Sequence, residues 1–71
     1  MKAHTSLEAA LEAINSFDGE AKNFSLPISD EMNDATGLNM AIITDRILAK
    51  GWTPNDFEQR KGFRIYRYRK A

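Results

Sequence analysis

The stretch GFRIYRYRK, residues 62–70, decides how this sequence is interpreted. After a glycine, four cations are interleaved with three aromatic residues and an isoleucine. Aromatic and β-branched residues favour strands, and the side chains of a strand alternate between its two faces. We therefore predict a strand over residues 63–69.

The two faces of this expected strand differ in character. One carries two apolar residues followed by two arginines: Phe63, Ile65, Arg67 and Arg69. The other alternates cations with tyrosines: Arg64, Tyr66, Tyr68 and Lys70. Because the first face begins with apolar residues, we expect it to meet the core and the second to face outward. Cations beside tyrosines suit a phosphate backbone with bases to stack on. Alternatively, the tyrosines cover a thin core and the cations protect a sheet edge.

The formal net charge is zero, but the charges are unevenly distributed. Residues 1–45 contain two Lys or Arg against eight Asp or Glu, a net charge of −6. Residues 46–71 contain eight against two, a net charge of +6. Such asymmetry between halves indicates an anionic partner for the basic half. The alternative is that the two halves pack together and neutralise each other.

Residues 52–61, just before the expected strand, are compatible with two structures. Thr53 suits a helix N-cap and Pro54 suits the first helical position, which predicts a short helix over 54–60. Alternatively, residues 57–60 are a strand that turns at a Lys-Gly pair into the C-terminal strand, which would form a hairpin. The local signals favour the helix.

Further towards the N-terminus, the sequence predicts a helix and a short strand. Thr5 and Glu8 form a capping box that opens the helix, and Asp18-Gly19 ends it. Its apolar stripe is Leu7, Leu11 and Ile14, flanked by Ala10 and Phe17. Residues 24–28 then alternate apolar and polar except at a proline, which predicts an edge strand.

Two more helices are expected in the middle of the chain. Ser29 caps a helix over 30–35, whose inward residues are Met32 and Ala35. Asn39 caps a helix over 40–50. Its inner seam is Ile43 and Ile47, with Met40 and Leu48 beside them. The competing interpretation is one continuous helix over 30–50, because a glycine inside a helix costs only about 1 kcal/mol.

This order of elements resembles the winged helix-turn-helix family over about residues 24–70. The stretches that carry the resemblance are ISDEMNDATGLNMAIITDRILAKGW (28–52) and QRKGFRIYRY (59–68). The resemblance implies a turn at residues 37–39, a recognition helix over 40–50 and a wing tip at residues 60–62. It also implies an α+β fold with about three helices and a small antiparallel sheet formed by residues 24–28 and 63–69. The length of 71 residues allows only a single domain, 1–71.

The expected recognition helix departs from the family pattern. It is about a turn shorter than usual, and its expected exposed face is Met40, Ala41, Thr44 and Asp45. These residues include no arginine or lysine to read bases, and the carboxylate repels phosphates. We therefore expect most contacts with nucleic acid to come from the basic C-terminal half.

The first expectation is a small bacterial DNA-binding regulator or accessory protein. Its nucleic-acid contacts would be Arg60, Lys61, Arg64, Tyr66, Arg67, Tyr68, Arg69 and Lys70, with Asn39, Met40 and Thr44 nearest the groove. The resemblance also implies pairing as a homodimer. The alternative is a protein-interaction module, for example of a mobile element, with Trp52 and Tyr66 exposed.

Other classes of function have little support in the sequence. The chain has no cysteine, a lone histidine at His4 near a terminus expected to fray, and no paired nucleophile and base, so we expect neither an enzyme nor a cofactor. Acids at residues 30, 31 and 34 fit a helix start better than a cation site. Arg46 and Lys50 fit a helix C-terminus. Without a signal peptide or an apolar run long enough for a membrane span, we expect a cytoplasmic protein.

Overall fold

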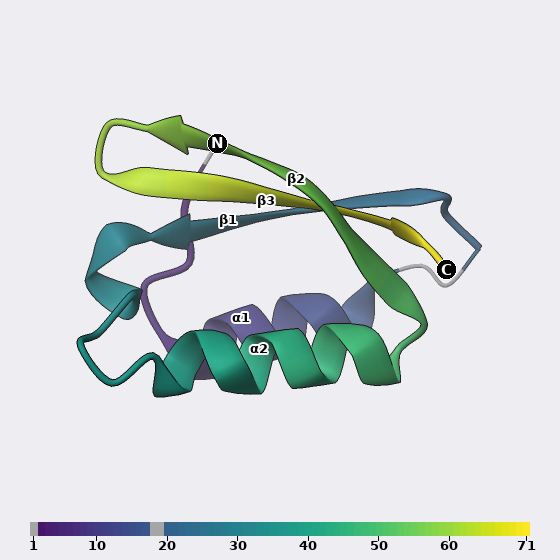
Figure 1. Cartoon of the computed structure of the whole chain (residues 1–71), viewed down its shortest axis with the longest axis horizontal. Coiled ribbons are helices and arrows are strands. Elements are labelled where there is room, and N and C mark those ends of the chain that lie inside the picture. The colour runs from purple at the N-terminus through teal and green to yellow at the C-terminus, as the bar shows by residue number, and fades with distance from the viewer. Residues whose placement is uncertain (1, 18–19) are drawn as a thin grey trace.

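A computed structural model, which describes residues 2–17 and 20–71, shows an α+β structure of two layers. A three-stranded antiparallel sheet lies on two helices (Figure 1). In chain order the elements are α1 (Leu7–Ser16), β1 (Asn23–Ser29), the 3-10 turn η1 (Asp30–Met32), α2 (Leu38–Ala49), β2 (Trp52–Arg60) and β3 (Phe63–Lys70). The strand order is β1-β3-β2, so the C-terminal strand is central. The expected strands over 24–28 and 63–69 are confirmed, the former at a sheet edge.

The hairpin of β2 and β3 replaces the expected helix over 54–60. The two strands pair along their length, from Trp52 opposite Lys70 to Arg60 opposite Phe63. A shift in register beside Pro54 accommodates the proline, which cannot donate a ladder hydrogen bond. Gly62 closes the turn with a φ of 87°, a conformation that favours glycine. The helix prediction was wrong because pairing with β3 outweighs the local capping signals.

The first helix is confirmed, with a different N-cap. Ser6, rather than Thr5, has the extended cap conformation, and its hydroxyl accepts a hydrogen bond from the amide of Ala9 at 3.2 Å. The expected stop at residues 18 and 19 lies outside the described residues. The terminus before the helix is tied to the sheet, because the amide of His4 donates to the carbonyl of Pro27 and its carbonyl accepts from Ser29. The expected fraying at His4 was therefore wrong.

The helix expected over 30–35 is only the single turn η1. Asn33 leaves helical geometry at φ −85° and ψ 75°, and the carboxylate of Asp34 accepts from the amide of Gly37 at 2.9 Å. Gly37 has a φ of 71° and precedes α2. This break also rules out the continuous helix over 30–50. Asn39 lies inside the first turn of α2 and does not cap it. Its side-chain amide Nδ2 donates to the backbone carbonyl of Met32.

The core lies between the sheet and the helices. Its buried side chains are Ala10, Ile14, Phe24, Leu26, Ile28, Met32, Ile43, Ile47, Trp52 and Tyr68. The inward placements of Met32, Ile43 and Ile47 are confirmed. Those of Ala35 and Leu48 were wrong, since both are exposed. Trp52, expected at the surface, is only 2% exposed.

The face of the sheet that packs on the helices is the opposite of the expected one. Phe24, Leu26 and Ile28 of β1 belong to the core. Their partners directly across β3 are Tyr68, Tyr66 and Arg64. Residues directly opposite each other share a face, so the alternating tyrosine and cation side of β3 faces the helical layer. Phe63, Ile65, Arg67 and Arg69 therefore lie on the outer face of the sheet.

Candidate nucleic-acid interface

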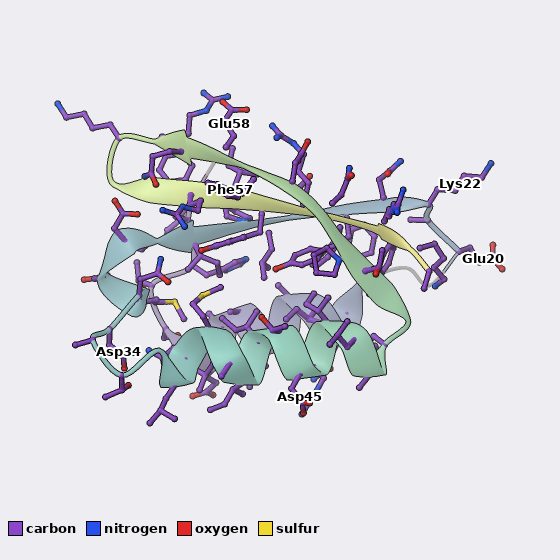
Figure 2. All side chains as sticks on the ribbon, in the orientation of Figure 1. Glu20, Lys22, Asp34, Asp45, Phe57 and Glu58 are labelled. Carbon is purple, nitrogen blue, oxygen red and sulfur yellow. The ribbon has the colours of Figure 1, made fainter. Side chains whose placement is uncertain are left out.

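The outer face of the sheet has an apolar centre with polar and basic surroundings. Ile65 is 6% exposed and lies between Pro27 and Glu58 on the neighbouring strands. Arg69 lies between Asn23 and Thr53, and is exposed. Glu58 points away from the helices (Figure 2). This face, rather than the tyrosine side, is the broad surface that the sheet offers to a partner.

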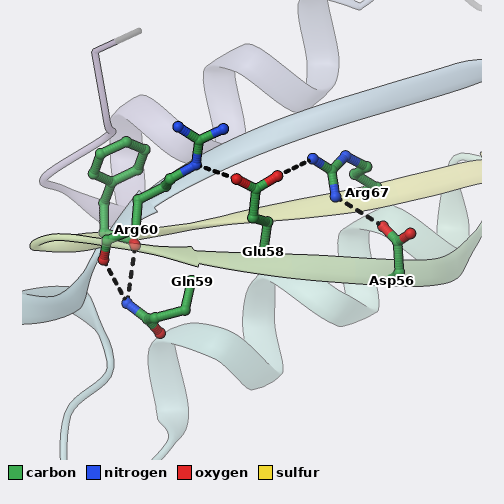
Figure 3. A network of polar contacts seen from close by, with 6 residues as sticks. Asp56, Glu58, Gln59, Arg60 and Arg67 are labelled. Carbon is green, nitrogen blue, oxygen red and sulfur yellow. Dashed lines mark hydrogen bonds and ion pairs between the residues drawn. The ribbon is translucent and has the colours of Figure 1, made fainter.

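A chain of ion pairs occupies part of this outer face (Figure 3). Glu58 is paired with Arg60, and its Oε1 lies 2.6 Å from Nη2 of Arg67. Nη1 of Arg67 also lies 3.2 Å from Oδ1 of Asp56. The hydrogen bonds from Arg67 and then Arg60 lower the pKa of Glu58, and those to Glu58 and Asp56 raise the pKa of Arg67. Two of the arginines expected to bind phosphate thus already have acidic partners.

Arg64 and an aromatic pair form a second feature at the turn end of the hairpin. The guanidinium of Arg64 lies 4.6 Å from the ring centre of Phe57 and 5.8 Å from that of Tyr66. Its Nε donates to Gln59 at 3.0 Å, and its Nη1 donates to the hydroxyl of Tyr66 at 3.3 Å. These contacts hold the guanidinium plane against the rings. Phe57 is 56% exposed, so the helical layer leaves this end of the sheet uncovered.

The remaining residues of the expected site differ in how exposed they are. Lys61, at the turn, and Arg69 are exposed, and neither has an acidic partner among the described residues. Lys70 lies 4.8 Å from the ring centre of Trp52. Tyr68 is 4% exposed within the core, and its burial raises its pKa to about 12. The expected outward position of Tyr68 was therefore wrong. Tyr66, which was expected on the same exposed face, is half-buried.

The helix expected to read bases turns a different face outward. Asn39, Met40 and Thr44 are half-buried, and Met40 packs against the core. The exposed side of α2 carries one acid among apolar residues: Leu38, Ala41, Ile42, Asp45, Leu48 and Ala49. Asp45 points away from the sheet (Figure 2). The expected exposure of Ala41 and Asp45 is confirmed, whereas Met40 and Thr44 are only partly exposed. Contact of Asn39, Met40 and Thr44 with nucleic acid stays a prediction.

Charge is segregated between the two layers. The sheet segments 20–29 and 52–71 hold seven cations and three acids. The helical segments 7–17 and 30–51 hold two cations and six acids. The sequence asymmetry thus becomes an asymmetry between layers, and the basic half is mostly sheet. The ion pairs on the outer face are made within the hairpin, not between the two halves.

Metal-binding and membrane-spanning features are the next kinds of site to consider. The described residues contain no cluster of three or more histidine, cysteine or acidic side chains that could hold a metal ion. No helix in the described ranges is long and apolar enough to cross a membrane. Phe57 and Gln59 were missed as site residues because their position against Arg64 depends on the hairpin register, which local patterns do not specify.

Comparisons with protein-family models, curated proteins and solved structures found no match for this chain. The winged-helix resemblance rests on the order helix, strand, helix-turn-helix and C-terminal strand or hairpin, of which the structure has the first helix, the strand, the last helix and the hairpin. The first helix of the motif, however, is only the turn η1. Membership of the winged-helix family stays a prediction.

Proposed function

We propose that this protein binds nucleic acid as a small regulator or accessory factor, through the sheet layer and the hairpin end. The observation that supports the proposal is the segregation of charge, with seven of the ten cations in the sheet segments. A local excess of cations attracts phosphates even when the net charge of the whole protein is zero.

Three cations are best placed for the first phosphate contacts. Lys61 and Arg69 have no acidic partner in the described part of the chain. Arg64 retains N–H groups beyond those donated to Gln59 and Tyr66. Arg60 and Arg67 must share or release Glu58 before they engage phosphate. Their contribution is therefore smaller than that of the unpaired cations.

Helix α2 is poorly suited to sequence-specific reading. Its outer face is apolar and carries Asp45, whose charge repels phosphates. The amide of Asn39, the side chain best able to read a base, is already bonded to Met32. The proposed binding is consequently directed at the phosphate backbone, with little preference among duplex sequences.

A gain-of-function variant tests this location. Glu58→Gln removes the acid between Arg60 and Arg67, so affinity for a fluorescent DNA should increase. Asp45→Asn makes the same change of charge on the outer side of α2 and should leave the affinity unchanged. DNA binding is measured for both variants at one ionic strength. Equal tightening by the two variants would show that only net charge matters, and absence of binding would end the proposal.

Protein binding through the outer face of α2 is the second candidate function. Leu38, Ile42 and Leu48 are 61%, 43% and 53% exposed, and two alanines lie among them. Exposed apolar patches on small domains mark interaction surfaces. Asp45 within the patch favours a partner that is apolar and carries a basic residue. A second copy of the chain would bring two Asp45 carboxylates to one interface.

Sedimentation equilibrium at increasing protein concentration tests self-association through this face. Under the second candidate function the wild type stays monomeric, because the face fits a basic partner better than itself. Self-association that disappears in Ile42→Lys would instead assign the face to the homodimer that the winged-helix resemblance implies.

A further inference from the structure

A cleft of about 260 Å³ opens between α2 and the hairpin. Its lining residues include Met40 and Thr44 from α2, Pro54 and Phe57 from β2, and Tyr66 and Tyr68 from β3. The cleft is smaller than the roughly 300–1,000 Å³ of pockets for drug-sized ligands. That volume suits a single flat ring system.

The chemistry of the cleft suits a ring with a polar edge. Its walls are mainly aromatic and aliphatic, and Thr44 and Asn55 are polar residues of the lining that can form hydrogen bonds. A nucleobase has an apolar π-face and donors and acceptors around its rim. Proteins that bind single strands commonly stack bases on exposed aromatic rings.

The cleft lies beside the cations of the hairpin end. Phe57 lines the cleft and has the guanidinium of Arg64 4.6 Å from its ring centre. The rings of Phe57 and Tyr66 have centres 6.2 Å apart. Phe57 is 56% exposed, whereas Tyr68 deeper in the cleft is 4% exposed. Phe57 is thus the ring that an incoming base can stack on, with Arg64 close enough to meet its phosphate.

We propose that this cleft holds one unstacked base of a single-stranded nucleic acid, with Phe57 as the stacking platform and Arg64 at the adjacent phosphate. This inference rests on the proposed nucleic-acid binding and extends it to a preference for single strands. A base within a duplex is stacked and paired, so it reaches the cleft only after it is unpaired. Single strands present their bases without that cost.

Loss of the platform ring is the first test. Phe57→Leu keeps an apolar side chain but removes the ring, and should weaken binding of a short single-stranded oligonucleotide by about 5- to 100-fold. Leu48→Ala, on the exposed side of α2, should have no effect. Duplex affinity should be unchanged in both variants. Equal affinity of Phe57→Leu and wild type for the single strand would overturn the proposal.

An uncharged probe separates failure of the cleft from failure of nucleic-acid binding in general. Adenosine carries a base but no phosphate, so it should shift the methyl resonances of Met40 and Thr44 in a saturable manner that Phe57→Leu abolishes. Unshifted methyl resonances would overturn the cleft proposal even if the protein binds DNA. Shifts without any DNA binding would keep the cleft as a base site and remove the proposed function.

Discussion

Tyr68 shows how the register of one strand changes the role of a residue. It lies opposite Phe24 on β1, with ring centres 6.0 Å apart, and also opposite Pro54 on β2. The central position of β3 therefore places it inside the core rather than at a surface. Burial disfavours the phenolate, and this raises the pKa of the hydroxyl to about 12.

The raised pKa makes stability depend on alkaline pH. An unfolded tyrosine titrates near 10, so the folded state of Tyr68 keeps its proton while the unfolded state loses it. The resulting stability is fully present below about pH 10 and is lost as pH rises towards about 12. Phenolate absorbance should show a late step that Tyr68→Phe removes. A Tyr68 step near pH 10 would contradict the burial.

Glu58 gives the opposite dependence, at acid pH. Its hydrogen bonds with Arg67 and Arg60 lower its pKa below the ordinary 4.5. The unfolded state therefore binds a proton first, and the stability that Glu58 contributes is present above about pH 4.5 and is lost as pH falls. Urea midpoints measured from neutral to acid pH should fall more steeply for wild type than for Glu58→Gln. Parallel curves would show that the ion pairs do not persist in solution.

At the scale of the element, α2 is apolar on both sides, and burial distinguishes them. Ile43 is fully buried and its neighbour Ile42 is 43% exposed. Ile43→Val should lower the free energy of unfolding by about 1 kcal/mol because it leaves a void in the core. Ile42→Val removes one methylene from the surface and should change the free energy of unfolding by less than about 0.5 kcal/mol. Denaturant unfolding compares the two, and equal losses would contradict the orientation of α2.

Elements with a clear local period were predictable, and those that depend on distant pairing were not. Alternation identified β1 and β3, and the stripe through Ile14 identified α1. Residues 54–60 carry helix-start signals, yet the ladder with β3 makes them a strand. The face of β3 was misassigned because Phe63 and Ile65 suggest a core side, whereas the apolar partners on β1 select the other.

At the scale of the molecule, the basic end was predictable from composition but its internal partners were not. Asp56 and Glu58 lie next to Arg67 only because the hairpin register brings them there. The platform of Arg64 on Phe57 has the same origin. The surface left for a nucleic acid is a sheet layer whose segments 20–29 and 52–71 have an excess of four positive charges. The helical segments 7–17 and 30–51 beneath it have an excess of four negative charges.

The salt dependence of DNA binding tests this division of the molecule most directly. Fluorescent DNA is titrated at about 50 and 200 mM salt with wild type, with Lys61→Ala/Arg69→Ala, and with Arg46→Ala/Lys50→Ala as a control of equal charge in the helical layer. Each lost phosphate contact lowers the slope of log affinity against log salt by about one unit. We predict a slope lower by about two units for the sheet variant and an unchanged slope for the control. Equal slopes for all three proteins, or no binding at the lower salt, would contradict a nucleic-acid surface on the sheet.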